Sequence, residues 1–115
     1  MINHVNQILE EIKTKFISAG IDKLVLFGSF AYGVPREDSD IDLLVVTSDD
    51  RIPQSFSEKS TLDVRYNRLI DHIKAHVPID LIVQTRGMHQ KFVEKNSLFG
   101  RELLTKGKVL YERSH

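Results

Sequence analysis

Residues 28–46 read GSFAYGVPREDSDIDLLVV, and this stretch decides the fold. A Gly-Ser pair opens it directly after the apolar run 24–27, and an Asp-Ile-Asp triplet at 40–42 leads into a second apolar run, 43–46. Short apolar runs bounded by glycine and polar residues are typical of buried strands. Side chains alternate between the two faces of a sheet, so both aspartates of the triplet are expected on one face.

The chemistry of this stretch follows from those two carboxylates and the Gly-Ser turn. A partly buried carboxylate pair is costly without a partner, so a cation or shifted pKa values are expected there. A Gly-Ser turn between a strand and a short helix can present backbone N–H groups to a phosphate. A phosphate site beside paired carboxylates is what metal-assisted chemistry on a nucleotide requires.

Hydrophobic periodicity outside this stretch predicts a small sheet covered by helices, which is an α/β or α+β fold. Asn96-Ser97 is expected to divide the last helical segment, and Ser57 or Ser60 is expected to cap the middle one. In chain order the predicted elements are a helix over 2–18, a strand over 21–27, a turn with one helical turn over 28–33, a polar loop over 35–39, a strand over 40–47, a loop over 48–56, a helix over 57–77, a strand over 79–84, a divided helix over 86–107 and a strand over 108–112.

A third acidic residue, Asp80, lies inside the predicted strand 79–84. If that strand neighbours strand 40–47, Asp80 can lie opposite Asp40 and Asp42, and three such carboxylates repel one another unless divalent cations neutralise them. Oxygen-only ligands favour Mg²⁺ or Mn²⁺ over zinc. Each part alone has an ordinary reading, as a solvated strand cap, a common turn or an edge-strand charge. Their combination favours the functional reading.

Composition bounds the remaining classes. The chain has 115 residues, which predicts one domain over 1–115, and its 16 basic and 16 acidic residues argue against a nucleic-acid partner. It has no cysteine, so disulfides and cysteine-based zinc sites are excluded. No signal peptide and no apolar run of about 20 residues is present, so no membrane association and a cytoplasmic location are expected. Basic residues over 91–108 (Lys91, Lys95, Arg101, Lys106 and Lys108) are read as a solvated face that could also steer an acidic ligand.

At this point the sequence resembles a known family. Gly28-Ser29, followed after ten residues by Asp40-x-Asp42, is similar to the signature of the nucleotidyltransferase superfamily with the DNA polymerase β fold. The short length and the ending 107–112 resemble its minimal, single-domain branch. The resemblance covers nearly the whole chain, and it is specific for the superfamily and much less so for the substrate.

The resemblance implies a mixed sheet flanked by helices, with Asp40, Asp42 and Asp80 as catalytic carboxylates that bind two Mg²⁺ ions. It also implies that Gly28 and Ser29 hold the terminal phosphates of a nucleoside triphosphate, and Ser39 is placed with them as a nucleotide-binding residue. Where many members carry arginine, this chain has Tyr32, and Arg36 is the expected substitute for that positive charge.

Minimal members commonly pair with a small helical HEPN protein as a toxin–antitoxin system. The expected function is therefore Mg²⁺-dependent transfer of AMP from ATP to a tyrosine of a HEPN toxin, as in a type VII antitoxin-like protein adenylyltransferase. The alternative is a non-catalytic nucleotide-binding module that neutralises its partner by contact. A nucleic-acid or aminoglycoside acceptor is a weaker reading. An exposed edge at strand 108–112 leaves a homodimer open.

Overall fold

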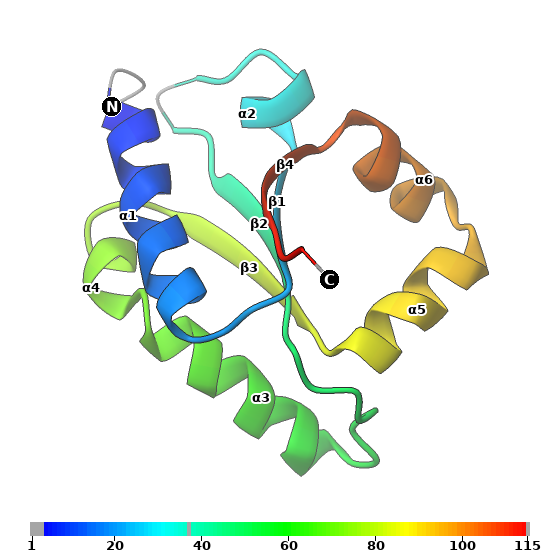
Figure 1. Ribbon diagram of the computed structural model, residues 1–115. Coiled ribbons are helices and arrows are strands. Elements are labelled where there is room, and N and C mark those ends of the chain that lie inside the picture. The colour runs from blue at the N-terminus through cyan, green and yellow to red at the C-terminus, as the bar shows by residue number, and fades with distance from the viewer. Residues whose placement is uncertain (1–3, 37, 115) are drawn as a thin grey trace.

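The computed structural model describes residues 4–36 and 38–114, which form a four-stranded mixed sheet between two layers of helices (Figure 1). The strand order is β3-β2-β1-β4, where β1 runs antiparallel to both β2 and β4, and β2 runs parallel to β3. The strands are β1 (Lys23–Phe27), β2 (Ile41–Val46), β3 (Ile79–Gln84) and β4 (Lys108–Glu112). The expected mixed sheet and helical flanks are confirmed.

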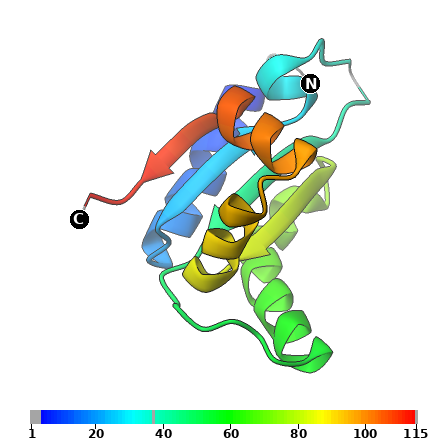
Figure 2. The same ribbon diagram turned by 90° about the vertical axis from the view of Figure 1, so that its right-hand side faces the viewer.

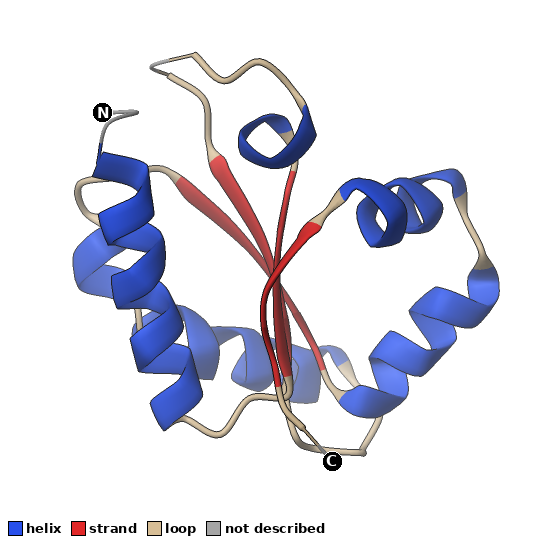
Figure 3. Ribbon diagram, turned by 45° about the horizontal axis from the view of Figure 1, so that its top comes forward, coloured by secondary structure: helices blue, strands red, loops and turns tan. Residues whose placement is uncertain are grey.

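Helices cover both faces of this sheet. The helices are α1 (Val5–Ser18), α2 (Ser29–Tyr32), α3 (Phe56–Arg68), α4 (Asp71–Lys74), α5 (Arg86–Lys95) and α6 (Leu98–Lys106). Figure 1 shows α1, α3 and α4 on one face and α5 and α6 on the other, and Figure 3 shows the same layers with the strands in red. The helix α2 lies at one end of the sheet, directly after β1. None of the helices formed by residues 4–36 and 38–114 has the length and apolar character of a membrane-spanning segment.

Each face of the sheet has its own apolar core, because alternate residues of the central strands point to opposite sides. The first core joins the sheet to α1, α3 and α4, and in β2 it takes Ile41, Leu43 and Val45. The second core joins the sheet to α5 and α6, and in β2 it takes Leu44 and Val46. Burial on both faces explains why β2 reads as an almost continuous apolar run.

The predicted helix over 57–77 is wrong in two respects. It is two helices, α3 and α4, because the backbone leaves helical geometry at Ile70 (φ −121°, ψ 15°), and this turn brings the Ile70 side chain into the first core. The N-cap is Ser55, not Ser57 or Ser60: the Ser55 hydroxyl accepts a hydrogen bond from the Glu58 N–H at 3.1 Å. The Glu58 carboxylate accepts in return from the Gln54 N–H at 2.6 Å, one residue before the cap.

The other elements agree with the sequence to within a few residues. Asn96 adopts the left-handed conformation (φ 52°) that ends α5, and the Ser97 hydroxyl accepts from the Gly100 N–H at 3.0 Å to begin α6. The predicted division at Asn96-Ser97 is therefore confirmed. The predicted start of the first helix, at residues 2–3, lies outside the described residues.

Candidate active site

The acidic residues of the two parallel strands lie side by side. Asp42 of β2 and Asp80 of β3 are register partners in the parallel ladder, so their side chains are on the same face of the sheet. This is the face covered by α5 and α6, because Leu44 and Val46 have the same alternation as Asp42 and contribute to the second core. Asp42 is half-buried, whereas Asp80 and Asp40, which lies one residue before β2, are exposed.

The electrostatics of Asp42 reflect its burial and its two acidic neighbours. Burial raises the pKa of Asp42 above its ordinary value, and the negative charges of Asp80 and Asp40 raise it further. Both neighbours therefore act on one carboxyl group, as the spacing of the two motifs predicts. A cation at this position would relieve the repulsion and favour the ionised form of all three.

Gly28 lies directly against the Asp42 carboxyl group. A Cβ atom placed on Gly28 would be 2.1 Å from Asp42 Oδ2, so the Asp42 carboxyl group would have to move. Gly28 also has φ +75°, a left-handed conformation that only glycine adopts without strain. Two independent constraints thus require glycine here, one from the backbone and one from the neighbouring carboxylate.

The Gly-Ser turn begins the single-turn helix α2 at the end of β1 (Figure 1). The Ala31 and Tyr32 N–H groups donate to the Gly28 carbonyl oxygen at 3.0 and 3.1 Å, which fixes the turn. The first N–H groups of a helix have no carbonyl partner inside it, so those at the start of α2 are of the kind that bind anions. Ser29 is the first residue of α2 and is half-buried.

Ser39 has a local role in the loop before β2. Its hydroxyl accepts a hydrogen bond from the Arg36 N–H at 2.8 Å, and its own N–H donates to the Arg36 carbonyl oxygen at 3.1 Å. These bonds close a turn that delivers the chain to Asp40. The structure therefore brings Gly28 and the three aspartates together, and it places Ser39 as a turn residue whose contact with a nucleotide stays a prediction.

The sequence did not predict that one cation of the basic group over 91–108 lies near α2. The Lys106 ammonium group, at the end of α6, lies 6.0 Å from the centroid of the Tyr32 ring. No motif marks Lys106, because the contact arises only when α6 packs beside α2. Arg36, the expected substitute for the missing positive charge, is exposed, and its described hydrogen bonds are made by its backbone.

The carboxylates of the two parallel strands do not form a ready-made metal cluster. Across residues 4–36 and 38–114, no three His, Cys, Asp or Glu side chains come close enough together to hold a metal ion. The donors present are nevertheless of the kind that Mg²⁺ prefers, namely carboxylate oxygens on neighbouring strands. Burial and, after it, the charges of Asp80 and Asp40 raise the pKa of Asp42, and a divalent cation would offset the part that comes from those charges.

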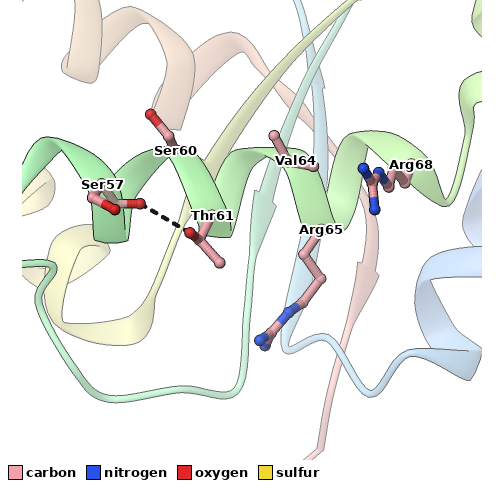
Figure 4. Close-up of a pocket in the computed structure, with 6 residues that line it drawn as sticks. All are labelled: Ser57, Ser60, Thr61, Val64, Arg65 and Arg68. Carbon is pink, nitrogen blue, oxygen red and sulfur yellow. Dashed lines mark hydrogen bonds between the residues drawn. The ribbon is translucent and has the colours of Figure 1, made fainter.

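A separate hollow of about 530 Å³ lies along α3 and contains none of the predicted site residues (Figure 4). Its lining comes from a single helix face, where the Thr61 hydroxyl donates to the Ser57 carbonyl oxygen at 2.9 Å. The lining residues are Ser57, Ser60, Thr61, Val64, Arg65 and Arg68. The helix α3 packs on the first core, whereas Asp42 and Asp80 lie on the sheet face of the second core. This hollow is therefore distinct from the carboxylate site.

The family model described as "Nucleotidyltransferase domain" matches residues 5–104, which contain both motifs and all three aspartates. The chain belongs to the nucleotidyltransferase family. It is similar to "Putative protein adenylyltransferase MJ0604" of Methanocaldococcus jannaschii, with 31% identity over 112 residues that cover 93% of this chain and 94% of that protein. By family, it is an enzyme that transfers a nucleotidyl group.

Solved structures of nucleotidyltransferases share its fold. A "putative nucleotidyltransferase from Sulfolobus solfataricus" superimposes with a TM-score of 0.56 at 20% identity, covering 98% of this chain and 81% of the other. A "toxin-antitoxin with AMP-PNP" superimposes with a TM-score of 0.50 at 20% identity, covering 95% of this chain and 73% of the other. At these identities the likeness establishes the fold, and the resemblance seen in the sequence is confirmed at the level of the family.

Proposed function

We propose that this nucleotidyltransferase moves AMP from ATP, with Mg²⁺, to the hydroxyl of a tyrosine on a HEPN-type partner protein, as an antitoxin does to its toxin. The observation that carries the proposal is the pairing of Asp42 with Asp80 across β2 and β3, beside the Gly28 turn. A nucleotidyl transfer needs a phosphate cradle next to clustered carboxylates. The neighbouring ends of β1, β2 and β3 support this reading, because they bring the Gly28 turn beside Asp42 and Asp80.

In this proposal Asp40, Asp42 and Asp80 would hold Mg²⁺, which would supply positive charge to offset that of the phosphates. Asp42 is half-buried and held against Gly28, so it suits a fixed ligand. Asp40 follows the Ser39 turn and can reach the same ion from the loop. Asp80 and Asp40, whose charges add to the effect of burial on the pKa of Asp42, would share the Mg²⁺ ions with it.

Asp80 is proposed to act on the acceptor hydroxyl. It is exposed, near the start of the edge strand β3, where a second molecule can approach, whereas Asp42 is recessed. A carboxylate within hydrogen-bond reach of the hydroxyl orients it and accepts its proton as the oxygen attacks phosphorus. The bond to pyrophosphate breaks as the new ester bond forms, and the start of α2, with Gly28 and Ser29, holds the departing phosphates.

Two relatives support a protein acceptor. MJ0604 is named as a protein adenylyltransferase, and the superimposed toxin–antitoxin structure was solved with the ATP analogue AMP-PNP. A tyrosine acceptor and a HEPN partner come from the resemblance of the Gly28-Ser29 and Asp40-x-Asp42 motifs to minimal members of the family. The assay therefore uses a HEPN-type partner and looks for a modified tyrosine.

The test is transfer of label from [α-³²P]ATP, with Mg²⁺ present, to the product of the neighbouring reading frame, which is the candidate partner. We expect one labelled tyrosine on the partner, and loss of labelling by at least about 100-fold in Asp40→Asn combined with Asp42→Asn, because metal ligands act together. Asp38→Asn, an exposed neighbour in the same loop, is the matched control. If the double variant no longer labels the partner but still neutralises it, the contact-only alternative is established instead.

A further inference from the structure

We propose that Lys106 binds the terminal phosphates of the nucleotide, as the cation that α2 itself lacks. This inference rests on the proposed function and adds a binding residue to it. Helix α2 carries no acidic residue in its first turn and no basic residue in its last turn. A triphosphate held at its start would therefore need its positive charge from another element.

The geometry points to Lys106 because its ammonium group lies over the ring of Tyr32, 6.0 Å from the ring centroid. Cation–π attraction at this distance favours a side chain directed toward α2 rather than into solvent. Tyr32 is half-buried against the second core and gives the ammonium a fixed surface. Figures 1 and 2 both show the C-terminal part of α6 beside α2.

The end of α6 is held in place by the residue that follows Lys106. A Cβ atom on Gly107 would lie 2.4 Å from the Leu103 carbonyl oxygen, 2.9 Å from Val25 Cγ1 and 3.3 Å from the Leu26 carbonyl oxygen. The chain therefore leaves α6 in close contact with Val25 and Leu26 of β1. Leu26 is two residues before Gly28. Because Gly107 is fixed there, Lys106 stays near the phosphate turn.

Lys106 is also available for a ligand. It is exposed, and among the described residues it has no carboxylate partner. A lysine in the last turn of a helix also interacts favourably with the helix dipole, so a purely structural role predicts only a small loss of stability on its removal. A role in binding predicts something different, namely a loss of affinity confined to nucleotides that carry the terminal phosphates.

The experiment is titration calorimetry of the full chain with Mg²⁺·AMP-PNP and, separately, with AMP. We expect Lys106→Met to weaken AMP-PNP binding by about tenfold, which is typical of one lost charge-assisted contact, and to change AMP binding by less than about twofold. Lys106→Arg should restore most of the affinity, because it keeps the charge. Lys91→Met removes an equally exposed lysine of α5 and should bind both ligands as the wild type does.

Equal weakening of both ligands, or wild-type affinity for AMP-PNP in Lys106→Met, would overturn the assignment while leaving the proposed function intact. Failure of the folded wild-type chain to bind Mg²⁺·AMP-PNP would overturn both. Circular dichroism and melting of each variant separate a loss of contact from a loss of fold.

Discussion

At the scale of single residues, the site depends on contacts that leave no room for substitution. Gly28 has a left-handed backbone and would place a Cβ atom on the Asp42 carboxyl group. We predict that Gly28→Ala lowers stability by about 1–3 kcal/mol and transfer activity by at least about 100-fold, because strain and a displaced carboxylate add. Gly20→Ala is the control: Gly20 also has positive φ, but its nearest neighbour, the Arg113 side chain, is 3.7 Å away. Gly20→Ala should lose stability and keep activity.

The raised pKa of Asp42 gives a second prediction at this scale. An acid whose pKa is raised by folding destabilises the native state at pH values above its folded pKa, and this penalty disappears below the unfolded pKa, where both states are protonated. Asp42→Asn should therefore raise the Tm at pH 7 by about 2–4 °C, and the gain should vanish toward pH 3.

With Mg²⁺ added, we expect the wild type, rather than Asp42→Asn, to have the higher Tm. Mg²⁺ should raise the Tm of the wild type by mass action and leave that of Asp42→Asn nearly unchanged. Thermal melts from pH 3 to pH 8, with and without Mg²⁺, measure both effects. A lower Tm for Asp42→Asn at pH 7 in the absence of Mg²⁺ would contradict the proposed repulsion.

The three aspartates could be predicted from the sequence because strand alternation and parallel pairing are local rules. Asp40 and Asp42 are two residues apart at the start of one apolar run, and Asp80 occupies the same place in another. Lys106 could not be assigned in this way, because its contact with Tyr32 depends on how α6 packs against the end of the sheet. No spacing in the sequence encodes that packing.

At the scale of elements, the N-cap of α3 is Ser55 in the structure, whereas the sequence predicted Ser57 or Ser60. Ser55→Ala should destabilise the protein by about 1 kcal/mol, because it removes the side chain that accepts from the Glu58 N–H. Ser57→Ala should be neutral or slightly stabilising, because its hydroxyl makes no described hydrogen bond and alanine is the better helix former. Urea denaturation of both variants checks this prediction. A larger loss for Ser57→Ala would restore the cap first expected from the sequence.

Strands and caps were easier to predict than the division of the helix over 57–77. The cap at Ser97 and the left-handed Asn96 are local signals, and both are found in the structure. The break at Ile70 has no glycine or proline to mark it. It arises because the turn buries Ile70 and Ile73 together in the first core, so tertiary packing overrides helix propensity there.

At the scale of the whole molecule, one buried aspartate connects three distant segments. Asp22 precedes β1, and its carboxylate accepts hydrogen bonds from the Arg86 guanidinium at the start of α5. Arg113, which follows β4, lies 3.8 Å from the same carboxylate, and its N–H donates to the Asp22 carbonyl oxygen at 2.7 Å. This cluster joins β1, β4 and α5 at the end of the sheet away from the active site.

We predict that Asp22→Asn lowers the Tm by roughly 5–10 °C, because it removes the negative charge that two arginines share. The activity of the folded variant at 20 °C should stay within about twofold of the wild type. Asp50→Asn also removes a partner of Arg86, at 3.4 Å, but that carboxylate is largely exposed, so its loss should shift the Tm by at most about 2 °C. Differential scanning calorimetry ranks the two variants, and an equal effect would contradict the distinction.

The pairing of β1 with β4 has a consequence for how the protein is made. Until residues 108–112 leave the ribosome, β1 has only β2 as its neighbour, and its other edge is bare. A nascent chain stalled or truncated before Gly107 would expose that edge, and such a product is prone to associate with other strands. The sheet is thus complete only when β4 has been made and pairs with β1.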